Sequence, residues 1–310
     1  MNFIVIGEPC VDLIHKADGS VTRSYGGILY SLISLAILAK KDTVYPVMNV
    51  GIDEADNILG LLANYPNIKT DGINIVDHKT RKVNLYYNMY NSGRSARFER
   101  STEPTYTLEY DAIEKFLQGT DSILINMISG IDITLETFQK IRNVFTGYIH
   151  IDIHNLVMKT NPDGTREHTH LEQWREWCKL PDTVQMNEFE VVSLSRTIKN
   201  EYKIVEEILI NLKGNSKGVV ITRGKMGATG YIRTLKRFGI EEFFDIERHD
   251  VESPAVDNFV DSTGCGDVFA SAFTFDFSKS RDFLKALYYA TRIASLNATL
   301  EGVEQLNRLK

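Results

Sequence analysis

The densest group of residues that could do chemistry is the segment D-S-T-G-C-G-D at 261–267, which an apolar helical pattern follows. Gly264 and Gly266, separated by one small residue, predict a tight turn that leads into a helix. Backbone N–H groups at a helix N-terminus lack partners, and with the helix dipole they favour an anion such as phosphate. An aspartate beside a phosphate, Asp267, suits a general base that takes the proton of an attacking hydroxyl. The alternative is that Asp267 only caps the helix.

A second polar group follows the strand expected at 183–186. Asn187 and Glu190 are three residues apart, so a helix would place them on one face. Their oxygens suit a hydrated Mg²⁺ that arrives with nucleotide phosphates, although N-x-x-E is also typical of an ordinary helix start.

A third group follows the strand expected at 218–222. Thr222, Gly224 and Gly227 form a loop where phosphates or a ribose could rest. A plain hairpin turn into a short strand at 228–232 is the alternative.

Near the N-terminus, Asp12 comes just after the strand expected at 3–6, and Gly26 and Gly27 open the first long helix. A carboxylate at this place can accept hydrogen bonds from two hydroxyls of a polyol. The alternative is a solvated loop aspartate.

Other charged residues have weaker signals. A zinc site is not favoured, because no cysteine or carboxylate frame joins the candidate ligands. These are His150, His154, His168 and His170. Three arginines in one segment could clamp a phosphorylated acceptor, although a solvated strand edge is the ordinary reading. They are Arg94, Arg97 and Arg100.

The sequence has no G-x-x-x-x-G-K-[ST], and Phe269 occupies the third glycine position of a G-x-G-x-x-G, so neither nucleotide motif is present.

The elements that must position these residues alternate between short apolar strands and helical stretches. The expected strands are 3–6, 43–50, 122–126, 148–153, 183–186 and 218–222. The expected helices are 28–40, 55–65, 108–117, 135–144, 188–194, 201–212, 264–273 and 281–300. Such alternation predicts an α/β fold with a largely parallel sheet covered on both faces, and ligands at the carboxyl ends of its strands.

One segment departs from this alternation. Residues 82–90 and 95–100 read as two strands around a turn at 91–93. Because its faces are polar, this hairpin is a candidate lid, and its edge is a candidate homodimer contact. A surface excursion without a role is the alternative.

Composition limits the class of protein. The chain has 310 residues, 43% of them hydrophobic, and a net charge of −6, which favours neither nucleic acid nor anionic lipid as a partner. Its three cysteines are far apart, which fits a reducing cytoplasm and no disulfide framework. No apolar run is long enough for a membrane span, and the N-terminus lacks the basic region of a signal peptide. We therefore expect one cytoplasmic domain over 1–310.

These motifs, in this order, resemble the ribokinase-like (PfkB-type) carbohydrate kinase family, whose D-T-x-G-A-G-D signature is close to residues 261–267. The resemblance implies a three-layer, doubly wound, mostly parallel sheet with a small β lid from about 14–25 and 80–102. It also implies transfer of the γ-phosphoryl group of ATP, with Mg²⁺, to a hydroxyl of a small sugar. The implied roles are Asp267 as general base; Gly264, Cys265 and Gly266 as anion hole; Asn187, Thr222, Gly224 and Gly227 on the nucleotide; Glu190 on Mg²⁺ through water; Asp12, Gly26, Gly27 and Ser31 on the acceptor; and Asp261, Thr263 and Gly302 beside a monovalent cation such as K⁺.

The sequence departs from the family pattern at two places. Ser31 stands where an asparagine usually binds a sugar hydroxyl, and D-I-H-N-L at 152–156 replaces D-x-N-x-R. The acceptor is therefore open to a different sugar, a sugar acid or a nucleoside, for which Tyr86, Tyr87, Met89 and Tyr90 could supply an aromatic face. A non-catalytic protein of the same fold that binds a sugar or nucleotide is the remaining alternative.

Overall fold

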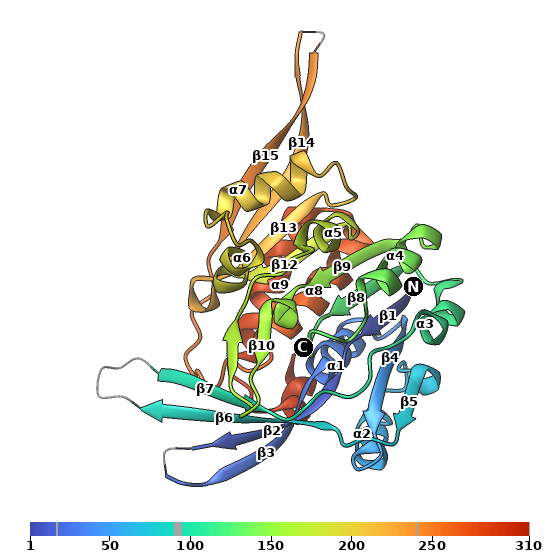
Figure 1. Cartoon of the computed structure of the whole chain (residues 1–310), viewed down its shortest axis with the longest axis vertical. Coiled ribbons are helices and arrows are strands. Elements are labelled where there is room, and N and C mark those ends of the chain that lie inside the picture. The colour runs from blue at the N-terminus through green and yellow to red at the C-terminus, as the bar shows by residue number, and fades with distance from the viewer. Residues whose placement is uncertain (17, 90–94, 240, 310) are drawn as a thin grey trace.

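The computed structural model describes residues 1–16, 18–89, 95–239 and 241–309. Its centre is a nine-stranded sheet (Figure 1). In spatial order the strands are β15 (Glu241–Val251), β14 (Ala228–Phe238), β13 (Gly218–Thr222), β12 (Thr183–Asn187), β9 (Tyr148–Asp152), β8 (Ser122–Asn126), β1 (Asn2–Ile6), β4 (Thr43–Gly51) and β5 (Ile73–Val76). The strands from β13 to β5 are parallel, and β14 and β15 add an antiparallel hairpin at one edge.

Both faces of this sheet are buried, as β1 illustrates. Phe3 and Val5 belong to one hydrophobic cluster, whereas Ile4 and Ile6 belong to another, because successive side chains of a strand point to opposite faces. One cluster packs under α1 (Ile28–Leu38), α2 (Ala55–Leu62), α8 (Cys265–Ser280) and α9 (Phe283–Asn297). The other packs under α3 (Tyr110–Leu117), α4 (Leu135–Val144), α5 (Trp174–Lys179), α6 (Glu188–Leu194) and α7 (Glu201–Glu206).

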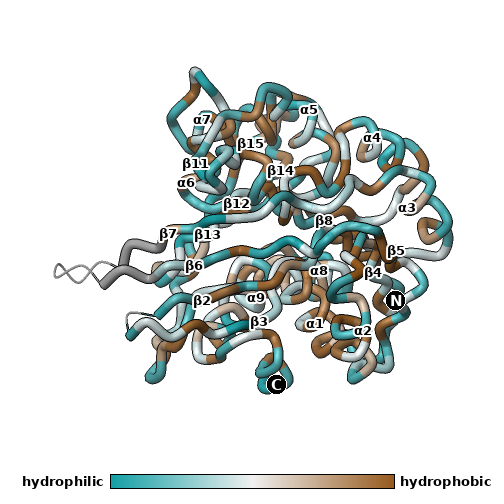
Figure 2. The backbone as a smooth tube through the Cα atoms, turned by 60° about the horizontal axis from the view of Figure 1, so that its bottom comes forward, coloured by the Kyte–Doolittle hydropathy of each residue, from teal (hydrophilic) through white to brown (hydrophobic). Residues whose placement is uncertain are grey.

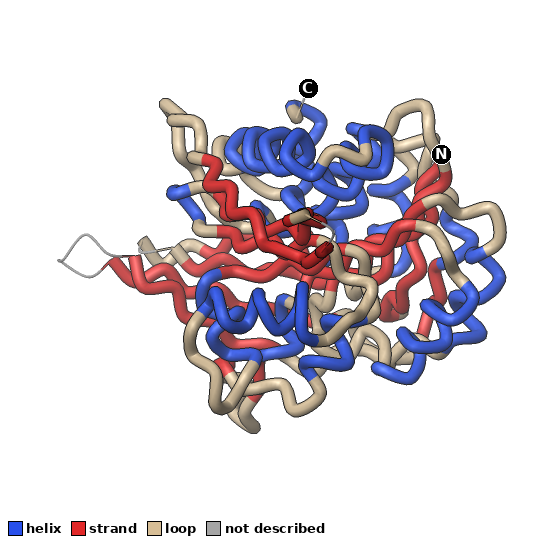
Figure 3. The backbone as a smooth tube through the Cα atoms, turned by 90° about the horizontal axis from the view of Figure 1, so that it is seen from above, coloured by secondary structure: helices blue, strands red, loops and turns tan. Residues whose placement is uncertain are grey.

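Figure 3 shows this layering from above, with helices on both sides of the strands. In Figure 2 hydrophobic segments gather where β4, α1 and α8 come together. The predicted three-layer α/β architecture is therefore confirmed. In the part of the chain that the structure describes, no helix is both long and apolar enough for a bilayer crossing.

A second, four-stranded sheet lies to one side of the main body (Figure 1). Its strands, in order, are β3 (Val21–Gly27), β2 (Pro9–His15), β6 (Arg81–Met89) and β7 (Ser95–Ser101). A short hairpin of β10 (Met158–Thr160) and β11 (Arg166–His168) contacts β7 through an isolated bridge between Arg100 and Thr165. This second sheet corresponds to the predicted small lid, although β2 begins earlier than expected. The predicted turn at 91–93, together with Tyr90 and Arg94, lies outside the described residues.

Two expectations about strands need correction. Asp12 lies in the middle of β2, rather than in a loop after the first strand. The hairpin of β14 and β15, which projects from the body in Figure 1, extends far beyond the short segment at 228–232 that the sequence suggested. Its outer residues are largely exposed and charged, so they lack the apolar run that marks a buried strand.

Candidate active site

A cavity of about 960 Å³ joins the two sheets. It passes the carboxyl ends of β9, β12 and β13 and the N-terminus of α8, and strands β2 and β6 of the second sheet border it. Twelve of the residues singled out in the sequence line it: Asp12, Gly27, Asn187, Glu190, Thr222, Gly224, Gly227, Thr263, Gly264, Cys265, Gly266 and Asp267. The fold therefore collects segments from the whole length of the chain at one place.

The N-terminus of α8 forms the floor of the cavity. Gly264 precedes the helix with φ of 75°, and a Cβ there would lie 2.3 Å from the Tyr30 ring, so only glycine fits. A Cβ on Gly266 would meet nothing within 4 Å, because this residue faces open space. The amide of Cys265 already donates to the carbonyl of Ser262 at 3.2 Å. The amides of Gly266 and Asp267, in the first turn, are therefore the better donors for an anion.

Asp267 is held by a residue that the sequence reasoning did not single out. Nδ2 of Asn126, the last residue of β8, donates to Oδ1 of Asp267 at 2.7 Å. Burial raises the pKa of Asp267, and the neighbouring His154 and the Asn126 hydrogen bond oppose that rise. The carboxylate thus faces the cavity and is oriented from another strand, which a helix cap alone would not require.

Ser31 is not where we expected it. It is fully buried beneath Asp267, and its hydroxyl donates to the Asp267 carbonyl at 3.0 Å and accepts from Asn126 at 3.2 Å. The cavity lining does not include Ser31 or Gly26. A Cβ on Gly26 would lie 2.1 Å from Oδ2 of Asp12, so this glycine makes room for the Asp12 carboxylate. Ser31 therefore contacts the site only through Asp267 and Asn126, and Gly26 affects it by making room for Asp12.

Asn187 and Glu190 begin α6 as a reciprocal cap. Oδ1 of Asn187 accepts from the amide of Glu190 at 2.9 Å, and Oε2 of Glu190 accepts from the amide of Asn187 at 2.7 Å. Both side chains also line the cavity, so the helix-start reading and the site reading are compatible.

His154 lies against Glu190 and has a positive φ of 38°, which is uncommon outside glycine. Its Nδ1 is 3.6 Å from Oε1 of Glu190. Burial lowers the pKa of His154, but Glu190, Asp152 and Asp267 outweigh burial and raise it to about 9. Burial, and then Glu190, raise the pKa of Asp152. This side of the cavity therefore holds a histidine that favours its charged form among three acidic side chains.

His150 is part of the core. It is fully buried, its Nδ1 is 2.7 Å from Oγ1 of Thr183, and its Nε2 faces Oε1 of Gln185 at 3.3 Å. Gln185 in turn donates to Oδ2 of Asp152 at 2.9 Å and to the carbonyl of Gly266 at 3.0 Å. Burial lowers the pKa of His150 to about 4. A chain of hydrogen bonds therefore connects the core to the N-terminus of α8, through a glutamine that the sequence reasoning missed.

The loop after β13 forms one end of the cavity. Gly224 and Gly227 have φ of 52° and 94°. A Cβ on Gly227 would lie 2.0 Å from the carbonyl of Val251, so the following segment packs closely against this loop. Small and apolar residues continue the lining at this end: Pro254, Ala255, Val256, Phe259, Ala294 and Ala298.

The opposite end contains Asp12. This residue is buried, and Oδ1 accepts a hydrogen bond from the Cys10 thiol at 3.3 Å. Two arginines that the sequence reasoning did not consider, Arg81 and Arg166, also line this end.

The residues fit Mg²⁺ only as an ion that arrives with phosphates. Among the described residues no group of three or more histidine, cysteine or acidic side chains could hold a metal by itself. Both oxygens of Glu190 already accept hydrogen bonds from Asn187, so Glu190 would hold Mg²⁺ through water. At the suggested cation position, Oδ1 of Asp261 accepts from the amide of Thr263 at 3.1 Å. Gly302 packs against Ser24 instead.

The remaining charged candidates lie elsewhere. His170 is 2.7 Å from Glu172 at the surface. Arg100 lies over the Phe98 ring at 5.5 Å and does not line the cavity, and the side chain of Arg97 is outside the described set. His168 lines the cavity without a metal-binding group around it in the described chain.

The family follows from the sequence as a whole. Residues 3–308 match the family described as pfkB family carbohydrate kinase. The chain belongs to this family. No curated protein matches the sequence.

Solved structures of PfkB-type and related kinases share the fold. A ribokinase from Thermotoga maritima is 19% identical, with a TM-score of 0.69 over 99% of this chain and 95% of that one. A pyrophosphate-dependent kinase of the ribokinase family is 16% identical, with a TM-score of 0.74 over 97% and 96%. A nucleoside kinase from Burkholderia thailandensis, in complex with inosine, is 12% identical, with a TM-score of 0.73 over 99% and 94%. At these identities the likeness concerns the fold, and neither donor nor acceptor follows from it.

Proposed function

We propose that this PfkB-family protein is a kinase that transfers the γ-phosphoryl group of ATP to a hydroxyl of a small carbohydrate. The observation that carries the proposal is the Asp267 carboxylate. It lies in the cavity beside the first-turn amides of α8, and Asn126 holds it at 2.7 Å. This pairing of a base with an anion site suits phosphoryl transfer, in which positioning and charge stabilisation do most of the work.

In the proposed step the phosphoryl group moves from ATP to a hydroxyl of the acceptor. The acceptor oxygen bonds to the γ-phosphorus, the bond between that phosphorus and the bridging oxygen breaks, and ADP leaves with the electron pair. Asp267 accepts the hydroxyl proton, and the amides of Gly266 and Asp267 hold the charge on the transferred group. Mg²⁺, held through water by Glu190, would neutralise the phosphate oxygens.

The lining of the cavity favours ATP over pyrophosphate as the donor. The small and apolar residues beyond Gly224 and Gly227, among them Val256 and Phe259, offer a surface for a nucleobase, which pyrophosphate does not have.

Of the four lid residues that could supply an aromatic face to a nucleoside, only the side chain of Tyr86 is described. Tyr86 stacks on His15 with ring centroids 4.2 Å apart and does not line the cavity. Among the lid side chains that the structure describes, none offers an aromatic face to the acceptor. A cytoplasmic location, a homodimer through the lid and K⁺ as an additional cation stay predictions.

Asp267→Asn tests this function. In an assay with ATP, Mg²⁺ and a panel of sugars, we expect turnover to fall by about 10² to 10⁴, with ATP affinity and melting temperature retained. Asp276→Asn is the matched control, because Asp276 lies on the same helix and bonds to Ser280 at 2.9 Å. Loss of stability and ATP affinity with an unchanged residual rate would instead support the helix-cap role.

A further inference from the structure

Two buried arginines meet at the acceptor end of the cavity. Arg81 begins β6 and is 4% exposed, and the Arg166 side chain, on β11, is 6% exposed. Both line the cavity that contains Asp12. Burial, and then the neighbouring Arg81, lower the pKa of Arg166. Two guanidinium groups that line one cavity repel each other, and a negative group bound between them removes that repulsion.

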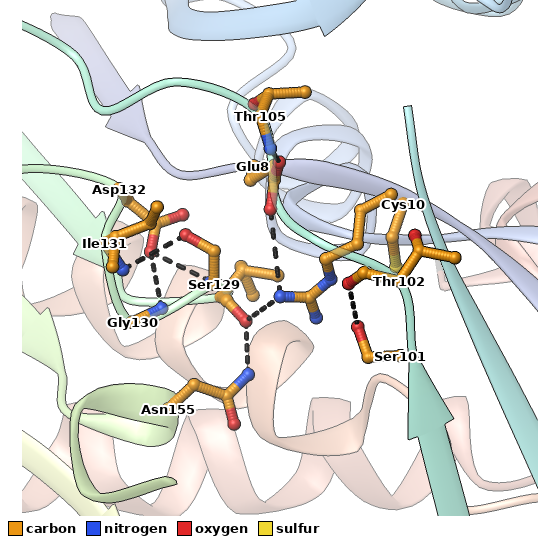
Figure 4. A network of polar contacts seen from close by, with 12 residues as sticks. Glu8, Cys10, Ser101, Thr102, Thr105, Ser129, Gly130, Ile131, Asp132 and Asn155 are labelled. Carbon is orange, nitrogen blue, oxygen red and sulfur yellow. Dashed lines mark hydrogen bonds and ion pairs between the residues drawn. The ribbon is translucent and has the colours of Figure 1, made fainter. Parts of the chain in front are cut away.

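The protein only partly satisfies Arg81. Its Nη1 donates to the carbonyl of Ile128 at 3.1 Å and lies 3.7 Å from Oε2 of Glu8, beyond hydrogen-bond reach. Figure 4 shows this network, in which the other Glu8 oxygen accepts from the amide of Thr105. Nε of Arg81 is buried and has no hydrogen-bond partner among the described residues. Such an unsatisfied buried donor is uncommon and indicates an absent water or ligand.

The protein also satisfies only part of the hydrogen-bonding capacity of Arg166. Its Nη1 donates to Oε2 of Glu99 at 3.2 Å, whereas its Nε is buried without a partner in the described chain. A guanidinium has five N–H donors in one plane, so a single carboxylate leaves most of them unused. The hairpin that carries Arg166 is tied to the lid, because the Ser101 amide of β7 donates to the carbonyl of Gly164 at 2.9 Å.

We propose that the acceptor is an anionic sugar, whose carboxylate or phosphate binds Arg81 and Arg166 while its hydroxyls bind Asp12. This inference rests on the proposed function, since it names the acceptor of the same site. A planar, bidentate anion matches the fork of each guanidinium and relieves their mutual repulsion. A neutral sugar would leave the buried Nε atoms of both arginines without an anionic acceptor.

The nearby carboxylates do not remove the need for this anion. Burial raises the pKa of Glu8 and of Asp132, which disfavours their charged forms. Asp132 directs Oδ2 to the amides of Ser129 and Gly130, at 2.9 and 3.1 Å, rather than to an arginine (Figure 4).

The test compares acceptors that differ in one group. The full chain is assayed with ATP and Mg²⁺ on a neutral aldose, the aldonic acid of the same carbon skeleton and the corresponding sugar monophosphate. We expect kcat/KM for one anionic acceptor to exceed that for the neutral sugar by about tenfold or more, as charge-assisted hydrogen bonds require. The acid and the phosphate ester, assayed separately, identify which anion the site takes.

Arg166→Met should lower the ratio of anionic to neutral kcat/KM by about tenfold or more, and Arg166→Lys should recover only part of it, because lysine lacks the planar fork. If the methionine variant does not fold, the lysine variant carries the test. Arg100→Met is the matched control, because Arg100 is on the lid but outside the cavity lining. A wild-type preference for the neutral sugar, or a ratio unchanged by Arg166→Lys and Arg166→Met, overturns the inference.

Calorimetric titration of the same acceptors without ATP separates the two proposals. Binding of the anionic acceptor above that of the neutral sugar, without phosphoryl transfer to any acceptor, would support the anion site and overturn the kinase. Transfer to neutral sugars alone, with no preferential binding of the anionic acceptor, would support the kinase function and overturn the anion site.

Discussion

Asn126→Ala should reduce the fraction of Asp267 that is ionised on the acidic side of the pH profile while leaving the backbone of the site in place. Asn126 is the last residue of β8 and is fully buried, and its Nδ2 lies 2.7 Å from Oδ1 of Asp267. The substitution removes the side-chain donor that favours the charged carboxylate. It also removes the 3.2 Å contact with Ser31, whose own bond to the Asp267 carbonyl remains.

The size of the effect follows from the type of hydrogen bond. A hydrogen bond to a charged group contributes about 1.5–3 kcal/mol. At about 1.4 kcal/mol per factor of ten, its loss corresponds to roughly 10-fold to 150-fold in the ionised fraction of Asp267, and therefore in kcat, at pH values on the acidic limb. The hydrogen bond from Asn126 lowers the pKa of Asp267 against the burial that raises it. Its removal should therefore move the acidic limb of the pH-rate profile to higher pH by about one to two units.

The assay is kcat as a function of pH with saturating ATP, Mg²⁺ and acceptor. Asn126→Asp should move the acidic limb in the same direction, because a second carboxylate beside Asp267 disfavours its charged form. Ser122→Ala is the matched control, since Ser122 begins the same strand and loses a buried contact of 2.7 Å with Ser278 at the opposite end.

A purely structural role for Asn126 makes a different prediction. In that case Asn126→Ala and Ser122→Ala would lower the melting temperature similarly, and neither would move the acidic limb. Such a result would refute the role assigned to Asn126 and remove the main argument that Asp267 is more than a cap.

Two further predictions concern the metal and the core. Glu190→Gln should raise the Mg²⁺ concentration needed for half-maximal rate more than it raises the acceptor KM, because Glu190 lines the cavity where the phosphates are proposed to bind. An unchanged Mg²⁺ titration would exclude a role of Glu190 in holding the metal. The pKa of His150 is about 4, against an ordinary 6.5. The free energy of unfolding is therefore about 3 kcal/mol higher above pH 6.5 than below pH 4 on account of this residue. The difference is lost as the pH falls from 6.5 to 4, because the unfolded chain binds the proton first. In urea unfolding, His150→Gln should therefore show less loss of stability over that range than the wild type; equal losses would contradict the buried, neutral state.

The parts of the site that the sequence predicts well are local. The segment at 261–267 contains its own turn glycines, its helix start and its aspartate, so short-range rules are sufficient. Asn187 and Glu190 are also predictable, since a polar pair after a buried strand is visible in the sequence. The parallel sheet could also be predicted, because its strands are continuous apolar runs, as expected when both faces of a sheet are buried.

The parts that could not be predicted depend on tertiary contacts. Ser31 was expected to face the acceptor, but α1 is buried on nearly every side, so its sequence has no polar face that indicates which side turns to the cavity. Asn126 is 141 residues from Asp267 in the sequence, and its only local signal is a polar residue at the end of a buried strand. Arg166 reaches the cavity through the β10–β11 hairpin, whose strands have three residues each and leave little trace in the sequence.

The strength of the base is therefore a property of the fold and not of the motif. Burial alone would keep Asp267 protonated to higher pH, whereas His154 and Asn126, from the ends of neighbouring strands, favour the charged form. The charge on His154 depends in turn on Glu190, which the capping box of α6 holds in place. A variant at any of these positions should change the pH at which the chain works without touching residues 261–267. Conversely, a chain with the motif but without these neighbours would keep its aspartate protonated to higher pH than this chain does, because burial would act with less opposition.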